Sequence, residues 1–60
     1  MKLQRGEILN QLEITDIVEE GKGVARHEGI VFFVAGAVPG DVVDIRVLNK
    51  QRRYYEAEVA

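Results

Sequence analysis

The sequence of 60 residues contains no cysteine, no serine and no tryptophan. Without cysteine it can form neither a disulfide, a thiolate zinc site nor an iron–sulfur cluster. With one histidine, one threonine and no serine, it also lacks the residue pairs on which nucleophilic catalysis depends. We therefore expect no catalytic residue, metal or cofactor within these residues. The absence of cysteine is typical of an intracellular protein, and we expect a cytoplasmic one.

Long apolar runs are also absent. No stretch approaches the ~18 to 20 apolar residues that span a bilayer, and residues 1–7 lack the apolar segment of a signal peptide. We therefore expect neither secretion nor a membrane partner. A domain of 60 residues has room for a single small core. The sequence ends inside a predicted strand, which is typical of a fragment of a longer protein.

Alternation of apolar and polar residues predicts a succession of short strands. We predict them at residues 7–18, 24–27, 30–34, 42–48 and 54–60. Helical spacing competes in the first segment, but the β-branched residues at 14–18 favour a strand there. The last segment contains good helix formers and also alternates at residues 55, 57 and 59. In the first strand, Ile8, Leu12, Ile14 and Val18 share one parity and should face the same side.

Two glycine turns separate these strands. Glu28-Gly29 lies between apolar runs as a two-residue hairpin turn. Val38-Pro39-Gly40-Asp41 fits a type II turn, because proline presets φ at the second position and glycine accepts positive φ at the third. Without a helix to cover a sheet, closure best protects the strand edges. We predict an all-β fold, a small five-stranded antiparallel β-barrel over residues 6–60, after a flexible tail at residues 1–5.

Residues 21–47 follow one pattern: GxGVAR, then EG, an apolar strand, PGD and alternating valines. This pattern resembles the TRAM domain, and the resemblance covers roughly residues 6–59. It implies an OB-like RNA-binding barrel attached to enzymes that modify RNA bases. These are chiefly uracil-5-methyltransferases of ribosomal and transfer RNA and methylthiotransferases of transfer RNA. S-adenosylmethionine, or an iron–sulfur cluster, would then belong to another domain of the parent enzyme, and Met1 just before the barrel favours the uracil methyltransferases.

The net charge of −2 by itself opposes binding to nucleic acid, but the charges are unevenly distributed. Residues 45–55 contain no acid and carry four basic side chains, which are Arg46, Lys50, Arg52 and Arg53. Residues 49–53 are the most polar stretch between apolar runs and predict an exposed loop, where an OB-like barrel binds single strands. We hypothesise that these side chains contact phosphates; the alternative is a loop kept charged for solubility.

Aromatic side chains offer a second kind of contact. Tyr54 and Tyr55 have opposite strand parity, so one should pack inward, and we predict that Tyr54 is the exposed ring on which a base stacks. The alternative is that Tyr54 covers the barrel rim. Phe32 and Phe33 lie in a fully apolar run, which favours the core for both, although Phe33 matches the usual aromatic position of the family.

Two further basic residues lie near the first glycine turn. Arg26 matches the arginine of the family's GVAR stretch, and Lys22 precedes it; both are candidates for phosphate contact. The alternatives are an ion pair of Arg26 with Glu28 or Asp41, and a plain surface position for Lys22. We interpret His27 as an exposed hairpin residue.

These observations predict a monomeric accessory barrel that binds ribosomal or transfer RNA for the catalytic domain of the same protein. The rival hypothesis is a small barrel whose acidic surface binds a basic protein partner.

Overall fold

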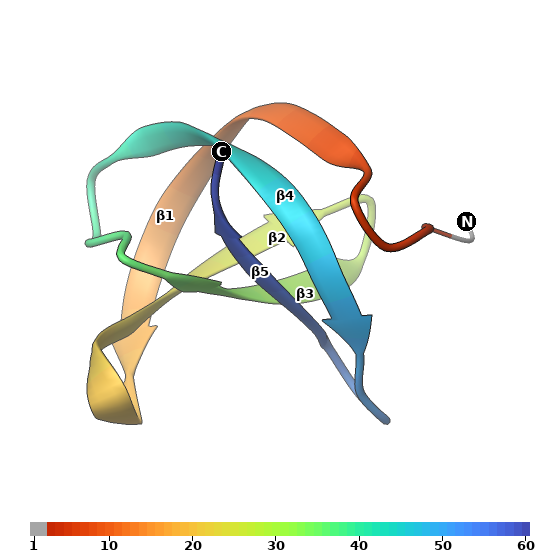
Figure 1. The fold of residues 1–60 in the computed structure, drawn as a ribbon. Helices are drawn as coiled ribbons and strands as arrows, with labels where there is room; N and C mark the ends of the chain where they lie inside the picture. Colours follow the sequence, from red (N-terminus) through yellow and green to blue (C-terminus); the bar gives the residue numbers. More distant parts are fainter. Residues whose placement is uncertain (1–2) are drawn as a thin grey trace.

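Five strands form where the sequence alternates, in a computed structural model that describes residues 3–60 (Figure 1). They are β1 (Ile8–Val18), β2 (Lys22–His27), β3 (Ile30–Ala35), β4 (Val42–Lys50) and β5 (Tyr55–Val59), and a short 3-10 turn, η1 (Glu19–Gly21), joins β1 to β2. The predicted strands are thus confirmed, including the first and last, for which a helix competed. No helix in this described part of the chain is long and apolar enough to cross a membrane.

The strands close into a barrel in the order β1-β2-β3-β5-β4, so the predicted all-β barrel is confirmed (Figure 1). The neighbouring pairs are antiparallel except for β3 and β5, which run parallel. A fully antiparallel arrangement, as expected from the sequence, is impossible here. In a closed ring with an odd number of strands, the directions cannot alternate all the way around. At least one parallel pair is required, and β3 with β5 provides it.

Strand β1 contains two irregularities that change which side chains face the core. Its register against β4 shifts between Leu9 and Leu12, where Gln11 has a φ of 58°. Its register against β2 shifts between Ile14 and Asp16. Each shift adds a residue to β1 without a counterpart on the neighbouring strand, and side chains beyond it point to the opposite face.

The predicted parity of β1 is therefore only partly correct. Leu12 and Ile14 are buried, as predicted, and Leu9 packs against the same core from before the bulge. Ile8, however, is 42% exposed, and Val18 is half-buried and lines a groove on the outside of the barrel. A strict alternation over residues 7–18 fails because the bulges interrupt the pleat.

Apolar side chains from every strand fill the barrel. The core cluster consists of Leu3, Leu12, Ile14, Ala25, Phe32, Val34, Ala37, Ile45, Val47, Tyr55 and Ala57. Within residues 3–60 no polar or charged residue is buried. A barrel of this size is filled by its own side chains, so binding sites must lie on its outer surface.

The segment before β1 belongs partly to this core. The described residues begin at Leu3, which is 7% exposed and packs in the core cluster. The Gly6 N–H donates to the Val47 carbonyl at 2.6 Å, and the Val47 N–H donates to the Glu7 carbonyl at 2.8 Å. Residues 1–2 of the predicted tail lie outside the described residues; Leu3 packs in the core, whereas Gln4 and Arg5 are exposed.

Both predicted turns are present. Glu28 and Gly29 have φ values of 52° and 81°, the pair of positive values that a type I′ hairpin turn requires. At the second turn, Gly40 has a φ of 95° and the Asp41 N–H donates to the Val38 carbonyl at 3.1 Å, as in a type II turn.

Candidate nucleic-acid interface

A tight reversal joins β4 to β5 and exposes the basic residues of the loop. The Gln51 N–H donates to the Tyr54 carbonyl at 2.8 Å, which closes the turn. Arg52 and Arg53 lie between these residues and are exposed, and Lys50 is exposed at the end of β4. The predicted exposed loop at residues 49–53 is confirmed for residues 51–53, whereas Asn49 and Lys50 are exposed residues of β4.

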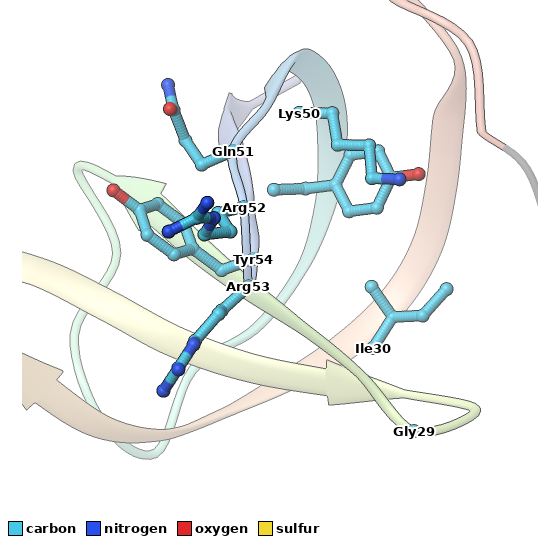
Figure 2. A pocket seen from close by; sticks show the side chains of 8 residues that line it. Gly29, Ile30, Lys50, Gln51, Arg52, Arg53 and Tyr54 are labelled. Carbon is cyan, nitrogen blue, oxygen red and sulfur yellow. The ribbon is translucent and has the colours of Figure 1, made fainter.

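This loop and the β2–β3 turn enclose a groove of about 230 Å³, which we call the basic groove. It is lined by Gly29, Ile30, Lys50, Gln51, Arg52, Arg53, Tyr54 and Tyr55. In Figure 2, Lys50 lies on the side of Ile30, whereas Arg52 and Arg53 lie on the side of Tyr54. None of these described lining residues is acidic, so the groove combines three cations with an aromatic wall.

Among the residues that the structure describes, the cations of the basic groove form no ion pair with an acidic side chain. The ion pairs found within residues 3–60 involve Lys22, His27 and Arg46, but not Lys50, Arg52 or Arg53. Cationic side chains without internal partners are available to neutralise phosphate charge, which is the main source of sequence-independent affinity for nucleic acid.

The two tyrosines point to opposite sides of β5 and its preceding loop. Tyr55 is 6% exposed and packs against Phe32 in the core, with ring centroids 5.6 Å apart. Tyr54 is half-buried on the outside, where its ring stacks on Phe33 with centroids 4.2 Å apart and planes 27° apart. As predicted, Tyr54 is the outward ring of the two and Phe32 lies in the core, but Tyr54 is half-buried rather than fully exposed, as in the alternative in which it covers the rim.

Phe33 is the residue that the sequence reasoning missed. It is half-buried rather than in the core, and it faces outward beside Tyr54. Strand parity could have predicted this position. Phe32 and Phe33 are adjacent in one strand, so only one of them can face the inside of the barrel. Residues 30–34 are all apolar, so the sequence shows no alternation that would mark the outward side chains. In the structure, Ile30 and Val31 are half-buried like Phe33.

A second groove, of about 360 Å³, lies on the other side of Tyr54, and we call it the aromatic groove. It is lined by Val18, Glu19, Glu20, Lys22, Phe33 and Tyr54. These residues come from the end of β1, the η1 turn, β2, β3 and the β4–β5 loop. Because Tyr54 lines both grooves, they are neighbours on one surface of the barrel.

Glu56 on β5 connects the two grooves through its carboxylate. Its Oε2 lies 3.8 Å from the Lys22 Nζ, and its Oε1 accepts a hydrogen bond of 3.1 Å from Gln51 Nε2. Lys22 therefore lines the aromatic groove with its charge partly compensated, and Gln51 is tied to the barrel wall.

Two of the predicted site residues do not join this surface. Arg46 Nη1 lies 2.7 Å from Glu58 Oε2, its partner in the β4–β5 register, and Arg46 lines neither groove. Arg26 is exposed on β2 and also lines neither groove. Its predicted alternative, an ion pair with Glu28 or Asp41, is not among the ion pairs of residues 3–60; Glu28 pairs instead with His27, at 3.6 Å.

A closed five-stranded barrel with the strand order β1-β2-β3-β5-β4 defines an OB-like protein, and its two grooves flank the loops that OB folds use to bind oligonucleotides and oligosaccharides. The chain belongs to the TRAM domain family, whose model matches residues 2–60.

Curated relatives are named as RNA methyltransferases. An uncharacterized RNA methyltransferase of Streptococcus pyogenes is 45% identical over 58 residues, which are 93% of this chain and 12% of the relative. Another, from Corynebacterium glutamicum, is 34% identical over 59 residues, covering 98% of this chain and 14% of the relative. The chain thus spans only a small part of the proteins that it matches.

The fold also resembles a solved structure. The solution structure of the conserved protein from the gene locus MMP0076 of Methanococcus maripaludis superposes with a TM-score of 0.85 at 29% identity. The match covers 97% of this chain and 81% of the archaeal one.

Proposed function

We propose that this chain is an RNA-binding accessory domain that positions ribosomal or transfer RNA for a separate catalytic domain. In this proposal it acts as a monomer and has no catalytic residue of its own. The observation that carries it is the basic groove, where Lys50, Arg52 and Arg53 lie beside Tyr54 without acidic partners in the described residues. The cations hold phosphates, and the tyrosine ring supports an unstacked base.

Charge distribution explains how a chain with a net charge of −2 binds a polyanion. The acidic side chains Glu19 and Glu20 line the aromatic groove and not the basic one. RNA phosphates are therefore attracted to one groove and repelled from the next, which fixes where the RNA backbone runs. An accessory domain needs this orienting effect more than it needs high affinity.

The parent enzyme in this proposal is a uracil-5-methyltransferase that uses S-adenosylmethionine. Support comes from relatives that are named as RNA methyltransferases and from the membership of the chain in the TRAM domain family. Since this chain covers 12% to 14% of those relatives, the methyl transfer and the S-adenosylmethionine site belong to a domain outside the 60 residues.

Titration of the labelled chain with a transfer or ribosomal RNA hairpin, read by fluorescence anisotropy, tests the proposal. Micromolar or weaker affinity is expected, and three phosphate contacts give a slope of log K against log salt of about −2, at ~0.7 per contact on single strands. The variant Arg52→Glu with Arg53→Glu should lose binding at low salt. The control Arg46→Glu, outside both grooves, should keep most of it. Unchanged binding in the double variant would refute the site.

A further inference from the structure

The aromatic groove differs from the basic groove in its charge. Its lining residues include Glu19 and Glu20, which are exposed and form no ion pair within residues 3–60. Its one cation, Lys22, already has the Glu56 carboxylate at 3.8 Å. A phosphate in this groove would meet two free carboxylates, whereas a neutral ligand would not be repelled.

Aromatic surface makes up the remaining wall of this groove. The stacked rings of Phe33 and Tyr54 are both half-buried, so each keeps part of its surface open to solvent. Every RNA base has a flat face that stacks on such rings. The groove, of about 360 Å³, is open to solvent on its outer side, so a flat ligand can lie against the rings. A flat, uncharged heterocycle fits both the shape and the charge.

Hydrogen bonding narrows the choice among the bases. A carboxylate only accepts hydrogen bonds, so a base that is read by Glu19 or Glu20 must present N–H donors. Adenine and cytosine each offer one amino group on the Watson–Crick edge, and uracil offers only its N3–H. Guanine offers N1–H and the N2 amino group side by side, which matches the two oxygens of one carboxylate.

We infer that the aromatic groove binds an unpaired guanine, stacked beside Phe33 and Tyr54, whose N1–H and N2 amino group donate to the carboxylate of Glu19 or Glu20. This inference rests on the proposed function and adds base selectivity to it. The phosphates next to the guanine lie in the basic groove, because Tyr54 is common to both grooves. The recognised element is a guanine in a single-stranded loop.

Binding of four pentanucleotides to the 60-residue chain tests this inference: UUGUU, UUAUU, UUUUU and UUIUU, where I is inosine. Inosine keeps the purine ring and N1–H of guanine but lacks the N2 amino group, so it separates carboxylate recognition from purine stacking. We expect UUGUU to bind about fivefold or more tightly than UUUUU, in line with a bidentate base contact. We expect UUIUU and UUAUU to bind more weakly than UUGUU.

The paired variant is Glu19→Ala with Glu20→Gly, where glycine suits the φ of 67° at position 20. It should bind UUGUU, UUIUU and UUAUU with similar affinity, because only purine stacking remains. The matched control is Glu13→Ala with Glu28→Gly, which removes the same charge and also replaces one glutamate of positive φ, at two exposed positions that line neither groove. The control should retain the preference for guanine.

The outcomes separate the two proposals. If no oligonucleotide binds even at low salt, the proposed function itself is wrong. If all four bind equally and the Arg52→Glu, Arg53→Glu variant abolishes binding, the proposed function stands and the guanine inference is wrong. If the preference for guanine persists without Glu19 and Glu20, the carboxylates are not its cause, and the inference is likewise overturned.

Discussion

The rings of Phe33 and Tyr54 stack with their centroids 4.2 Å apart on the outer surface of the barrel. This contact joins β3 to the β4–β5 loop, so the position of Tyr54 depends on a side chain from another strand. A loop residue that is held in this way is preorganised, which lowers the entropy lost when a ligand stacks on it.

Replacing Phe33 by leucine should therefore weaken RNA binding and lower stability less than a change in the core does. The change removes a stacked aromatic pair, worth about 0.5 to 1.5 kcal/mol, at a half-buried position and leaves the core intact. Fluorescence anisotropy with an RNA hairpin and thermal unfolding by circular dichroism measure the two effects. The control Phe32→Leu affects the 0% exposed core ring, and it should lower stability more than RNA affinity. Equal RNA affinity in Phe33→Leu and the parent chain would contradict this role.

Salt dependence should distinguish Arg52 from Arg46. Arg52 lines the basic groove without an acidic partner in the described residues, whereas Arg46 already contacts Glu58 at 2.7 Å. The slope of log K against log salt should become shallower by about 0.7 in Arg52→Gln, because one phosphate contact is lost. In Arg46→Gln it should stay within error of the parent value. Equal changes of slope in both variants would show that the ion pair does not remove Arg46 from the interface.

The ion pair of Arg46 with Glu58 could not be predicted from the sequence. Residues 45–55 contain no acid, so the local sequence predicts no acidic partner for Arg46. Its partner Glu58 lies twelve residues downstream and reaches it only through the β4–β5 register. A window of local sequence cannot detect such a pair, because register depends on how the whole barrel closes.

Features that depend on neighbouring residues could be predicted, whereas features that depend on distant strands could not. The hairpin at Glu28-Gly29 and the outward ring of Tyr54 were predictable because turn chemistry and strand parity are local properties. The bulge at Gln11 was not, since this residue has a φ of 58° without being glycine or asparagine, the types that usually mark positive φ. The Gln11 N–H donates to Asp44 Oδ1 at 2.9 Å, and this bond comes from β4, 33 residues away.

Replacing Glu28 by asparagine should stabilise the barrel. Glu28 has a φ of 52° in a type I′ turn, where asparagine before glycine is strongly preferred. We expect a gain of about 0.5 to 1 kcal/mol, because asparagine tolerates this conformation better than glutamate. For a chain of this size, 1 kcal/mol corresponds to a rise in Tm of about 4 to 8 °C.

The control for this change is Glu28→Gln, which also removes the carboxylate that contacts His27 but retains a long side chain at positive φ. Calorimetry should show a rise in Tm for asparagine and none for glutamine. A similar rise in both variants would assign the effect to charge rather than to backbone conformation.

Replacing Gly23 by alanine should destabilise the fold, because Gly23 lies where two parts of the chain approach closely. A Cβ at this position would lie 2.6 Å from Ile14 Cγ2 and 2.8 Å from the carbonyl oxygen of Ala37. The side chain of Ile14 is only 1% exposed and the carbonyl belongs to the backbone, so neither can move away freely. Overpacking of this kind costs about 1 to 3 kcal/mol. A lower midpoint of urea unfolding is therefore expected, with RNA affinity retained at temperatures where the variant stays folded. An unchanged midpoint would mean that the 36–41 loop can shift away from β2, which would contradict the close packing of Ala37 against Gly23.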